Sequence, residues 1–144
     1  RIYSRETGQD ESDSSGQAFA AVPAARSIGV GEVADLIGVT NLEDGDFRYN
    51  VGFVETTGQP IRVTATAVTS SGSSWISTSI QLQPFEPRQM SIDQLYNNVI
   101  GEGDNFRLRV TGADGDGKVI VFGSRIANDS QDATTFEMTF PAQP

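Results

Sequence analysis

Apolar and polar residues alternate with a period of two along much of this chain. In the run from Phe47 to Phe53, the side chains of Phe47, Tyr49, Val51 and Phe53 fall on one side, and polar or small residues fall on the other. Successive side chains of a β-strand point to opposite faces of a sheet, so this pattern predicts a strand with one buried face. Further strands are expected over 33–40, 61–67, 76–82, 106–110, 118–126 and 135–140.

Turn-forming residues separate these runs. They stand at 57–60, 70–73 and 113–117, where glycine, proline, serine and aspartate favour tight reversals, and hairpins are predicted there. The run 118–126 is apolar on both faces, which predicts a central strand. A strand and a turn about every 8–12 residues are typical of a β-sandwich with about 7–9 antiparallel strands. Ser91 and Gln94 have the spacing of a capping box and predict one short helix within 91–99.

The alternating pattern also predicts the core. Eight apolar side chains from six strands are expected to meet between two sheets. They are Phe47, Val51, Phe53, Val63, Ile80, Leu108, Val121 and Phe136.

The length of 144 residues fits one domain spanning 1–144. Residues 6–17 are acidic and free of large apolar side chains, so we expect a flexible loop or linker there. The net charge of −9 argues against nucleic acid as a partner, and no apolar run is long enough for membrane insertion. The polar, lysine-poor composition favours a secreted or cell-surface location.

The chain contains neither cysteine nor histidine. Thiol nucleophiles, Ser-His-Asp triads, disulfides and the usual zinc sites are therefore excluded. Carboxylates remain, but a glycosidase pair requires a cleft and a fixed separation, which small domains of short strands usually lack. We expect that this protein is not an enzyme.

Asp114 and Asp116, separated by glycines, are the candidate metal ligands. Alternating carboxylates and glycine begin many calcium loops, but six to eight oxygen ligands are needed, and the downstream glutamate of a helical calcium loop is missing. A hairpin turn explains the same residues without a metal and is the interpretation we favour. Calcium remains the alternative, and no other cofactor is expected.

Trp75 is the candidate ligand-binding residue. It precedes Ser77 and Ser79 on the polar side of its strand, where an exposed ring would stack on an extracellular glycan or anchor an interface. The other interpretation, which we favour, is a ring half-buried by a neighbouring loop.

The two ends of the chain repeat a short pattern. Arg-Ile followed by a polar run and an apolar-Pro-Ala triplet occurs at 1–24 and again at 125–142. A terminal strand that completes the sheet of a neighbouring unit would produce such a repeat, and it would extend copies into a filament. Coincidence is the alternative. The candidate assembly residues are Arg1, Ile2, Tyr3, Phe136, Met138 and Phe140.

Several segments together resemble a known type of module. They are Arg48-Tyr-Asn-Val-Gly-Phe-Val54, the Gly58-Gln-Pro60 turn, Leu82-Gln-Pro84, Arg88-Gln89 and Val119-Ile-Val-Phe-Gly-Ser-Arg-Ile126. In this order they are similar to the immunoglobulin-like β-sandwich modules of secreted bacterial multidomain and surface proteins.

The resemblance implies an immunoglobulin-like fold and a non-catalytic structural, adhesion or assembly role. The partners it implies are other domains or further copies of the same protein. The alternative function is an accessory module that binds carbohydrate or calcium.

Overall fold

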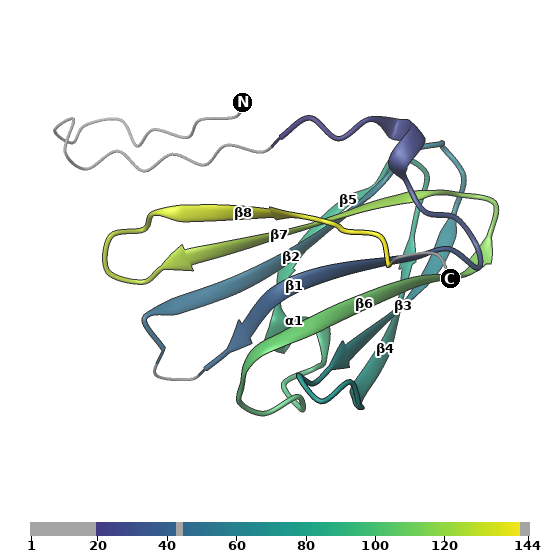
Figure 1. Cartoon of the computed structure of the whole chain (residues 1–144). Helices are drawn as coiled ribbons and strands as arrows, with labels where there is room; N and C mark the ends of the chain where they lie inside the picture. The colour runs from purple at the N-terminus through teal and green to yellow at the C-terminus, as the bar shows by residue number, and fades with distance from the viewer. Residues whose placement is uncertain (1–19, 43–44, 142–144) are drawn as a thin grey trace, which may run out of the picture.

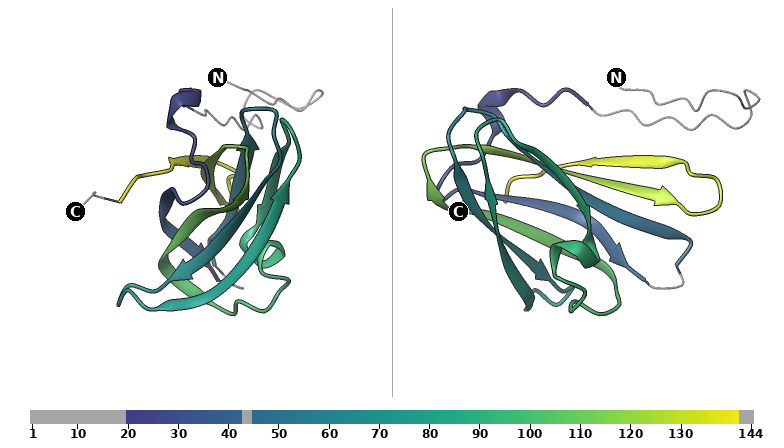
Figure 2. Two further views of the ribbon diagram at one scale, coloured as in Figure 1. Left: turned by 90° about the vertical axis from the view of Figure 1, so that its right-hand side faces the viewer. Right: turned by 180° about the vertical axis from the view of Figure 1, so that it is seen from behind.

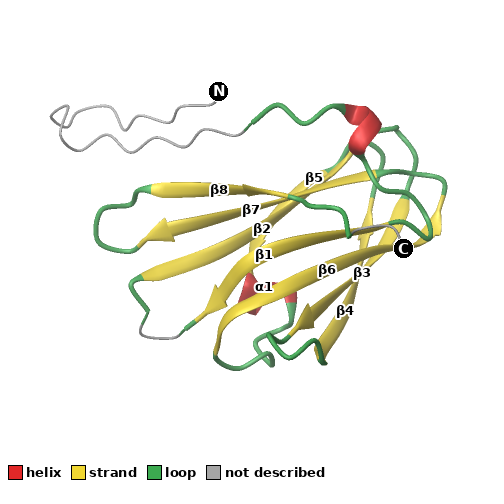
Figure 3. Ribbon diagram, in the orientation of Figure 1, coloured by secondary structure: helices red, strands yellow, loops and turns green. Residues whose placement is uncertain are grey.

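The structure is a computed structural model that describes residues 20–42 and 45–141 (Figure 1). Eight strands, one short α-helix and one 3-10 turn make up the described fold (Figure 3). Their bounds are η2 Ala24–Arg26, β1 Val33–Asn41, β2 Phe47–Glu55, β3 Ile61–Val68, β4 Ser74–Leu82, β5 Pro87–Ser91, α1 Ile92–Leu95, β6 Gly103–Gly115, β7 Val119–Ala127 and β8 Ala133–Glu137. The predicted antiparallel β-sandwich with one short helix is confirmed.

The strands form two four-stranded sheets, ordered β1-β6-β3-β4 and β5-β2-β7-β8. Every ladder is antiparallel. The run predicted to be central is β7, which lies between β2 and β8. Seen from behind, β3 and β4 lie well away from the β7–β8 hairpin (Figure 2).

One side of the sandwich is closed by hydrogen bonds between the sheets. Beyond β8 the chain turns toward β1, and the backbones of Asp35 and Thr139 exchange two hydrogen bonds of 2.8 Å. On the approach to β1, Ile28 pairs with Val119 of β7. Because both ends of the described chain connect the two sheets on this side, β4 and β5 remain as the outer strands of the opposite side.

Two of the three predicted hairpin turns are not hairpins. Residues 57–60 lead from β2 to β3, and residues 116–118 lead from β6 to β7, which in both cases is a change of sheet. Only the turn at 70–73 joins neighbouring strands, β3 and β4. Gly58 and Gly115 do have positive φ angles of 75° and 107°. Such glycines permit a tight reversal but do not determine which sheet the chain enters next.

The predicted core is largely confirmed. Six of its eight members are buried, namely Val51, Phe53, Val63, Ile80, Leu108 and Val121. Phe136 is partly buried and packs against this cluster. Phe47 is 40% exposed, so its assignment to the core is wrong. It is the first residue of β2, at the end of the sheet, where the Arg125 guanidinium lies 4.7 Å from its ring centroid.

The predicted capping box begins the helix. Ser91 accepts a hydrogen bond from the Gln94 backbone at 3.2 Å, and the Gln94 side chain accepts one from the Ser91 backbone at 3.1 Å. The helix is shorter than 91–99, because Asn97 and Asn98 adopt left-handed φ angles of 54° and 59° that end it.

Glu55 connects three turns at one end of the sandwich. Its carboxylate is 1% exposed and accepts backbone hydrogen bonds from Thr57, Gly58, Phe85 and Lys118, at 2.8, 2.7, 2.9 and 3.2 Å. Burial alone would raise the pKa of Glu55, but a hydrogen bond donated by the Thr57 hydroxyl, together with these backbone hydrogen bonds, lowers it from 4.5 to about 2. This carboxylate therefore fixes the position of all three turns.

Among the described residues, no helix is long and apolar enough to cross a membrane.

Candidate functional site

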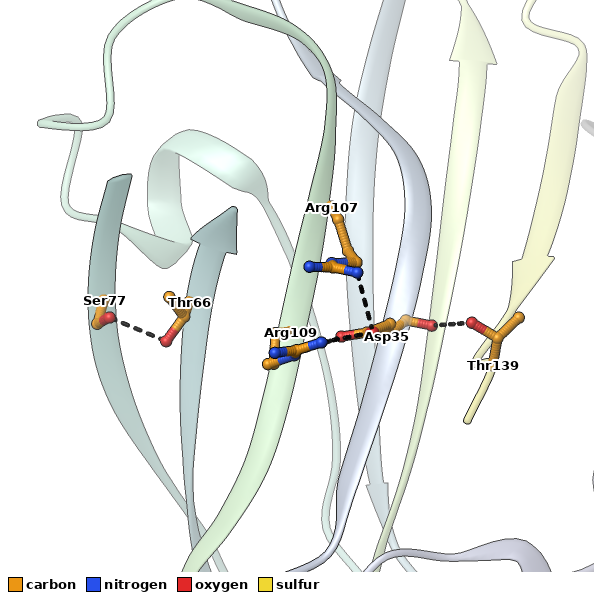
Figure 4. A network of polar contacts seen from close by, with 6 residues as sticks. All are labelled: Asp35, Thr66, Ser77, Arg107, Arg109 and Thr139. Atoms are coloured by element: carbon orange, nitrogen blue, oxygen red, sulfur yellow. Dashed lines mark hydrogen bonds and ion pairs between the residues drawn. The ribbon is translucent and has the colours of Figure 1, made fainter. Parts of the chain in front are cut away.

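A row of polar side chains crosses the outer face of the sheet that contains β1, β6, β3 and β4 (Figure 4). Asp35 is in register with Arg109, Arg109 with Thr66, and Thr66 with Ser77. Thr139 extends the row beyond β1 through its bridge to Asp35. Residues in register share a face, so the row lies on the side away from the core.

Asp35 is the buried centre of this row, with a side chain that is 6% exposed. Arg109 donates to its two oxygens, from Nε to Oδ1 at 3.0 Å and from Nη2 to Oδ2 at 3.2 Å. The hydrogen bond to Asp35 raises the pKa of Arg109. Thr139 also donates its hydroxyl to the Asp35 backbone carbonyl at 3.1 Å.

Arg107 is the second guanidinium beside Asp35. Its Nη1 lies 3.7 Å from Oδ2, which is too long for a hydrogen bond, and the side chain is 38% exposed. Its buried Nε has no hydrogen-bond partner in the described part of the chain. One carboxylate therefore faces two guanidinium groups, and Arg109 already occupies both of its oxygens.

A depression of about 410 Å³ lies next to Arg107. Its walls come from β1, from the turn between β3 and β4, and from the first part of β6. The lining residues are Ile37, Gly38, Thr69, Ser70, Ser71, Gly72, Asn105, Phe106 and Arg107.

Trp75 lies near the same end of the sheet and is 38% exposed. It is the extra residue of a β-bulge in β4, because Ala67 pairs with Ile76 while Val68 pairs with Ser74. Its ring meets Phe106 edge to face, with ring centroids 5.8 Å apart, and a Cβ on Gly103 would lie 2.5 Å from it. The ring is half-buried against β6, and a stacking role toward glycans stays a prediction.

The two candidate calcium ligands lie at the end of β6 and just beyond it. Asp114 accepts a hydrogen bond of 2.8 Å from Nη2 of Arg62, its register partner in β3, and both side chains are largely exposed. Asp116 follows in the turn to β7 and is exposed. The described residues contain no group of three or more histidine, cysteine or acidic side chains arranged to hold a metal ion.

We predict that adding calcium leaves the melting temperature almost unchanged, because Asp114 already pairs with Arg62 and the described residues bring no third acidic side chain into a metal-binding group with Asp114 and Asp116. An ion bound only by the folded state must stabilise it, so calcium titration followed by thermal unfolding measures the effect directly. A rise of many degrees that Asp114→Asn and Asp116→Asn abolish would contradict this prediction.

The candidate assembly residues divide into two groups. Arg1, Ile2 and Tyr3 lie outside the described residues. Phe136 belongs to β8 and contacts Tyr49, with ring centroids 5.7 Å apart. Met138 is buried, and its sulfur accepts a hydrogen bond from the Val121 backbone.

Phe140 is 48% exposed. The structure thus places the 136–138 segment in this domain's own core, and the exchange of terminal strands between units stays a prediction.

Asp35 was not predicted as a site residue, and the strand arginines, Arg107 among them, were interpreted as solvated residues of an outer face. A carboxylate within the otherwise apolar run 33–40 was the available signal for Asp35, and Arg107 and Arg109 stood at alternate positions of one strand. Asp35 and these arginines come together because β1 pairs with β6. The residues of either strand alone do not indicate that pairing.

No family model matches this sequence, and no curated protein matches it. Among solved structures, the chain is similar to the crystal structure of Thermotoga maritima 1070, with a TM-score of 0.58 and 9% sequence identity. The match covers 81% of this chain and 100% of that chain. At so low an identity the likeness concerns the fold alone.

Proposed function

We propose that this domain is a non-catalytic structural module of a secreted or cell-surface protein and that it joins a second copy of itself along β4. The observation that carries the proposal is that β4 is a long, uncharged edge strand. This strand has nine residues, Ser74–Leu82, and stands at the edge of its sheet. It contains no charged residue and no proline, two of the features that protect an exposed edge from pairing.

The other outer strands are shorter or already engaged. β5 and β8 have five residues each and carry Arg88 and Glu137, respectively. The outer edge of β1 is bridged by Thr139. Within the described chain, β4 therefore offers the longest row of backbone donors and acceptors without a second strand.

The distribution of charge makes β4 the least repulsive place for two copies to meet. A chain with a net charge of −9 repels its own copies over most of its surface. Two β4 strands related by a twofold axis would bring together serine, threonine and isoleucine, with no like charges directly opposite. The uncharged strand is thus the surface on which self-association costs least.

The experiment is sedimentation velocity over a range of protein concentrations. We expect the wild type to associate as concentration rises and Ser79→Lys to stay monomeric, because the two lysines introduced at a β4–β4 contact would repel each other. Ser79 is exposed on β4. A wild type that is monomeric throughout would contradict the proposal.

Thr134→Lys is the matched control. Thr134 is also exposed, lies on the edge strand β8 and gives the same change of charge. It should associate as the wild type does. Equal loss of association in both variants would show that net charge, rather than β4, controls the contact.

A further inference from the structure

We propose that the depression beside Arg107 binds an acidic sugar, with the guanidinium of Arg107 holding the sugar carboxylate. The site is separate from the β4 edge and does not depend on the function proposed above. It lies at one end of the outer face, where β6 is flanked by β1 on one side and by β3 on the other.

Positive charge is in excess at this point. Arg62 pairs with Asp114, and Arg109 occupies both oxygens of Asp35. Among the described residues, Arg107 makes only a 3.7 Å ion pair with Asp35 (Figure 4). It is therefore the arginine of this face with hydrogen-bond donors to spare, and a planar guanidinium matches the two oxygens of a carboxylate.

The rest of the lining suits a sugar ring. Thr69, Ser70, Ser71 and Asn105 bring hydroxyl and amide groups that can bond to sugar hydroxyls. Ile37, which is 56% exposed, offers an apolar surface for the C–H face of a ring. The volume of about 410 Å³ falls within the range of roughly 300–1,000 Å³ typical of small-molecule sites.

The walls of the depression are held in place before any ligand arrives. In the turn between β3 and β4, the Thr69 backbone donates to Ser73 and the Gly72 backbone donates to Thr69, both at 2.9 Å. The Thr69 and Ser71 hydroxyls lie 2.8 Å apart. A preformed site loses less conformational entropy on binding.

A single surplus arginine favours a carboxylate over a more highly charged phosphate. The chain as a whole carries −9, so a dianion meets stronger repulsion than a monoanion. The proposed ligand class is therefore a monoanionic pyranose of the uronic acid type.

The test is a titration followed by amide NMR, with glucuronate as the probe. Glucose provides the same ring without the carboxylate, and acetate provides the carboxylate without the ring. We expect glucuronate to cause saturable shifts at 69–72 and 105–107, and both control compounds to bind much more weakly. Glucose or acetate binding as tightly as glucuronate would overturn the proposal, as would the absence of saturable shifts.

Two arginine variants test the assignment to Arg107. Arg107→Gln should weaken glucuronate binding by roughly tenfold or more, because a charge-assisted hydrogen bond is lost. Arg62→Gln removes an exposed arginine from the same face and should bind glucuronate as the wild type does.

Arg107→Lys keeps the charge without the planar fork, so intermediate binding is expected, and it provides a second variant if Arg107→Gln fails to fold. If Arg107→Gln folds and binds glucuronate as the wild type does, the assignment is refuted. If Arg107→Gln does not fold, unchanged binding in Arg107→Lys refutes it instead.

Discussion

Glu55→Gln is expected to lower the free energy of unfolding by about 3 kcal/mol or more. Both carboxylate oxygens of Glu55 accept hydrogen bonds, Oε1 from Thr57 and Lys118 and Oε2 from Gly58 and Phe85. A glutamine has one acceptor oxygen and one NH2 group, so its NH2 group would face two of these backbone donors and leave them without an acceptor. Chemical denaturation at neutral pH measures the loss.

The same carboxylate predicts how stability depends on pH. The pKa of Glu55 is about 2 in the folded protein, against an ordinary value of 4.5. A lowered folded-state pKa stabilises the native protein above the unfolded-state value, and this stabilisation disappears as pH falls from about 4.5 toward about 2. Integrated over that window, the difference corresponds to about 3 kcal/mol.

Glu137→Gln is the matched control for both effects. Glu137 is an exposed strand residue, and its replacement should change stability little. The free energy of unfolding of the wild type should decrease more than that of Glu55→Gln between pH 4.5 and pH 2. If the two decrease equally, the assignment of this acid sensitivity to Glu55 is wrong.

Phe53→Ala is expected to lower the free energy of unfolding by about 3–5 kcal/mol. Phe53 is fully buried in β2, in register with Val121 of β7 and Arg88 of β5. Removing its ring leaves a cavity between the sheets that the surrounding strands cannot fill completely. Thermal or denaturant unfolding provides the measurement.

Phe140→Ala serves as the comparison, because its ring is 48% exposed and its loss should have a small effect. An unchanged unfolding midpoint for Phe53→Ala would mean that the two sheets do not pack around this ring.

Seven of the eight described strands were predictable, because the period-two pattern of their own residues marks them locally. The exception is β5, Pro87–Ser91, which was not predicted because its five residues show no alternation of apolar and polar side chains. The capping box of Ser91 and Gln94 was predictable for the same reason. Phe47 was misassigned because the pattern indicates which face a side chain takes, but not where the opposing sheet ends.

Strand order was beyond local sequence signals. In an immunoglobulin sandwich the second strand pairs with the fifth, and the third with the sixth, as β2–β5 and β3–β6 do here. There, however, the first strand lies beside the second and the seventh beside the sixth. In this protein β7 lies beside β2, and β1 lies beside β6. The residues of the turns at 57–60 and 116–118 do not indicate which sheet the next strand joins.

The candidate sites depend on that strand order. Asp35 and Arg109 are separated by 74 residues and meet only because β1 pairs with β6. The depression beside Arg107 likewise combines β1, the 69–72 turn and β6. The uncharged character of β4 was visible in the sequence, but its place at the edge of a sheet was not.

Amide hydrogen exchange along β4, measured in dilute and in concentrated solution, tests the central proposal most directly. At low concentration, the β4 amides that do not bond to β3 should exchange rapidly, and at high concentration they should become protected. The same comparison in Ser79→Lys should show rapid exchange at both concentrations. Rapid exchange of these wild-type amides at every concentration would contradict pairing through β4.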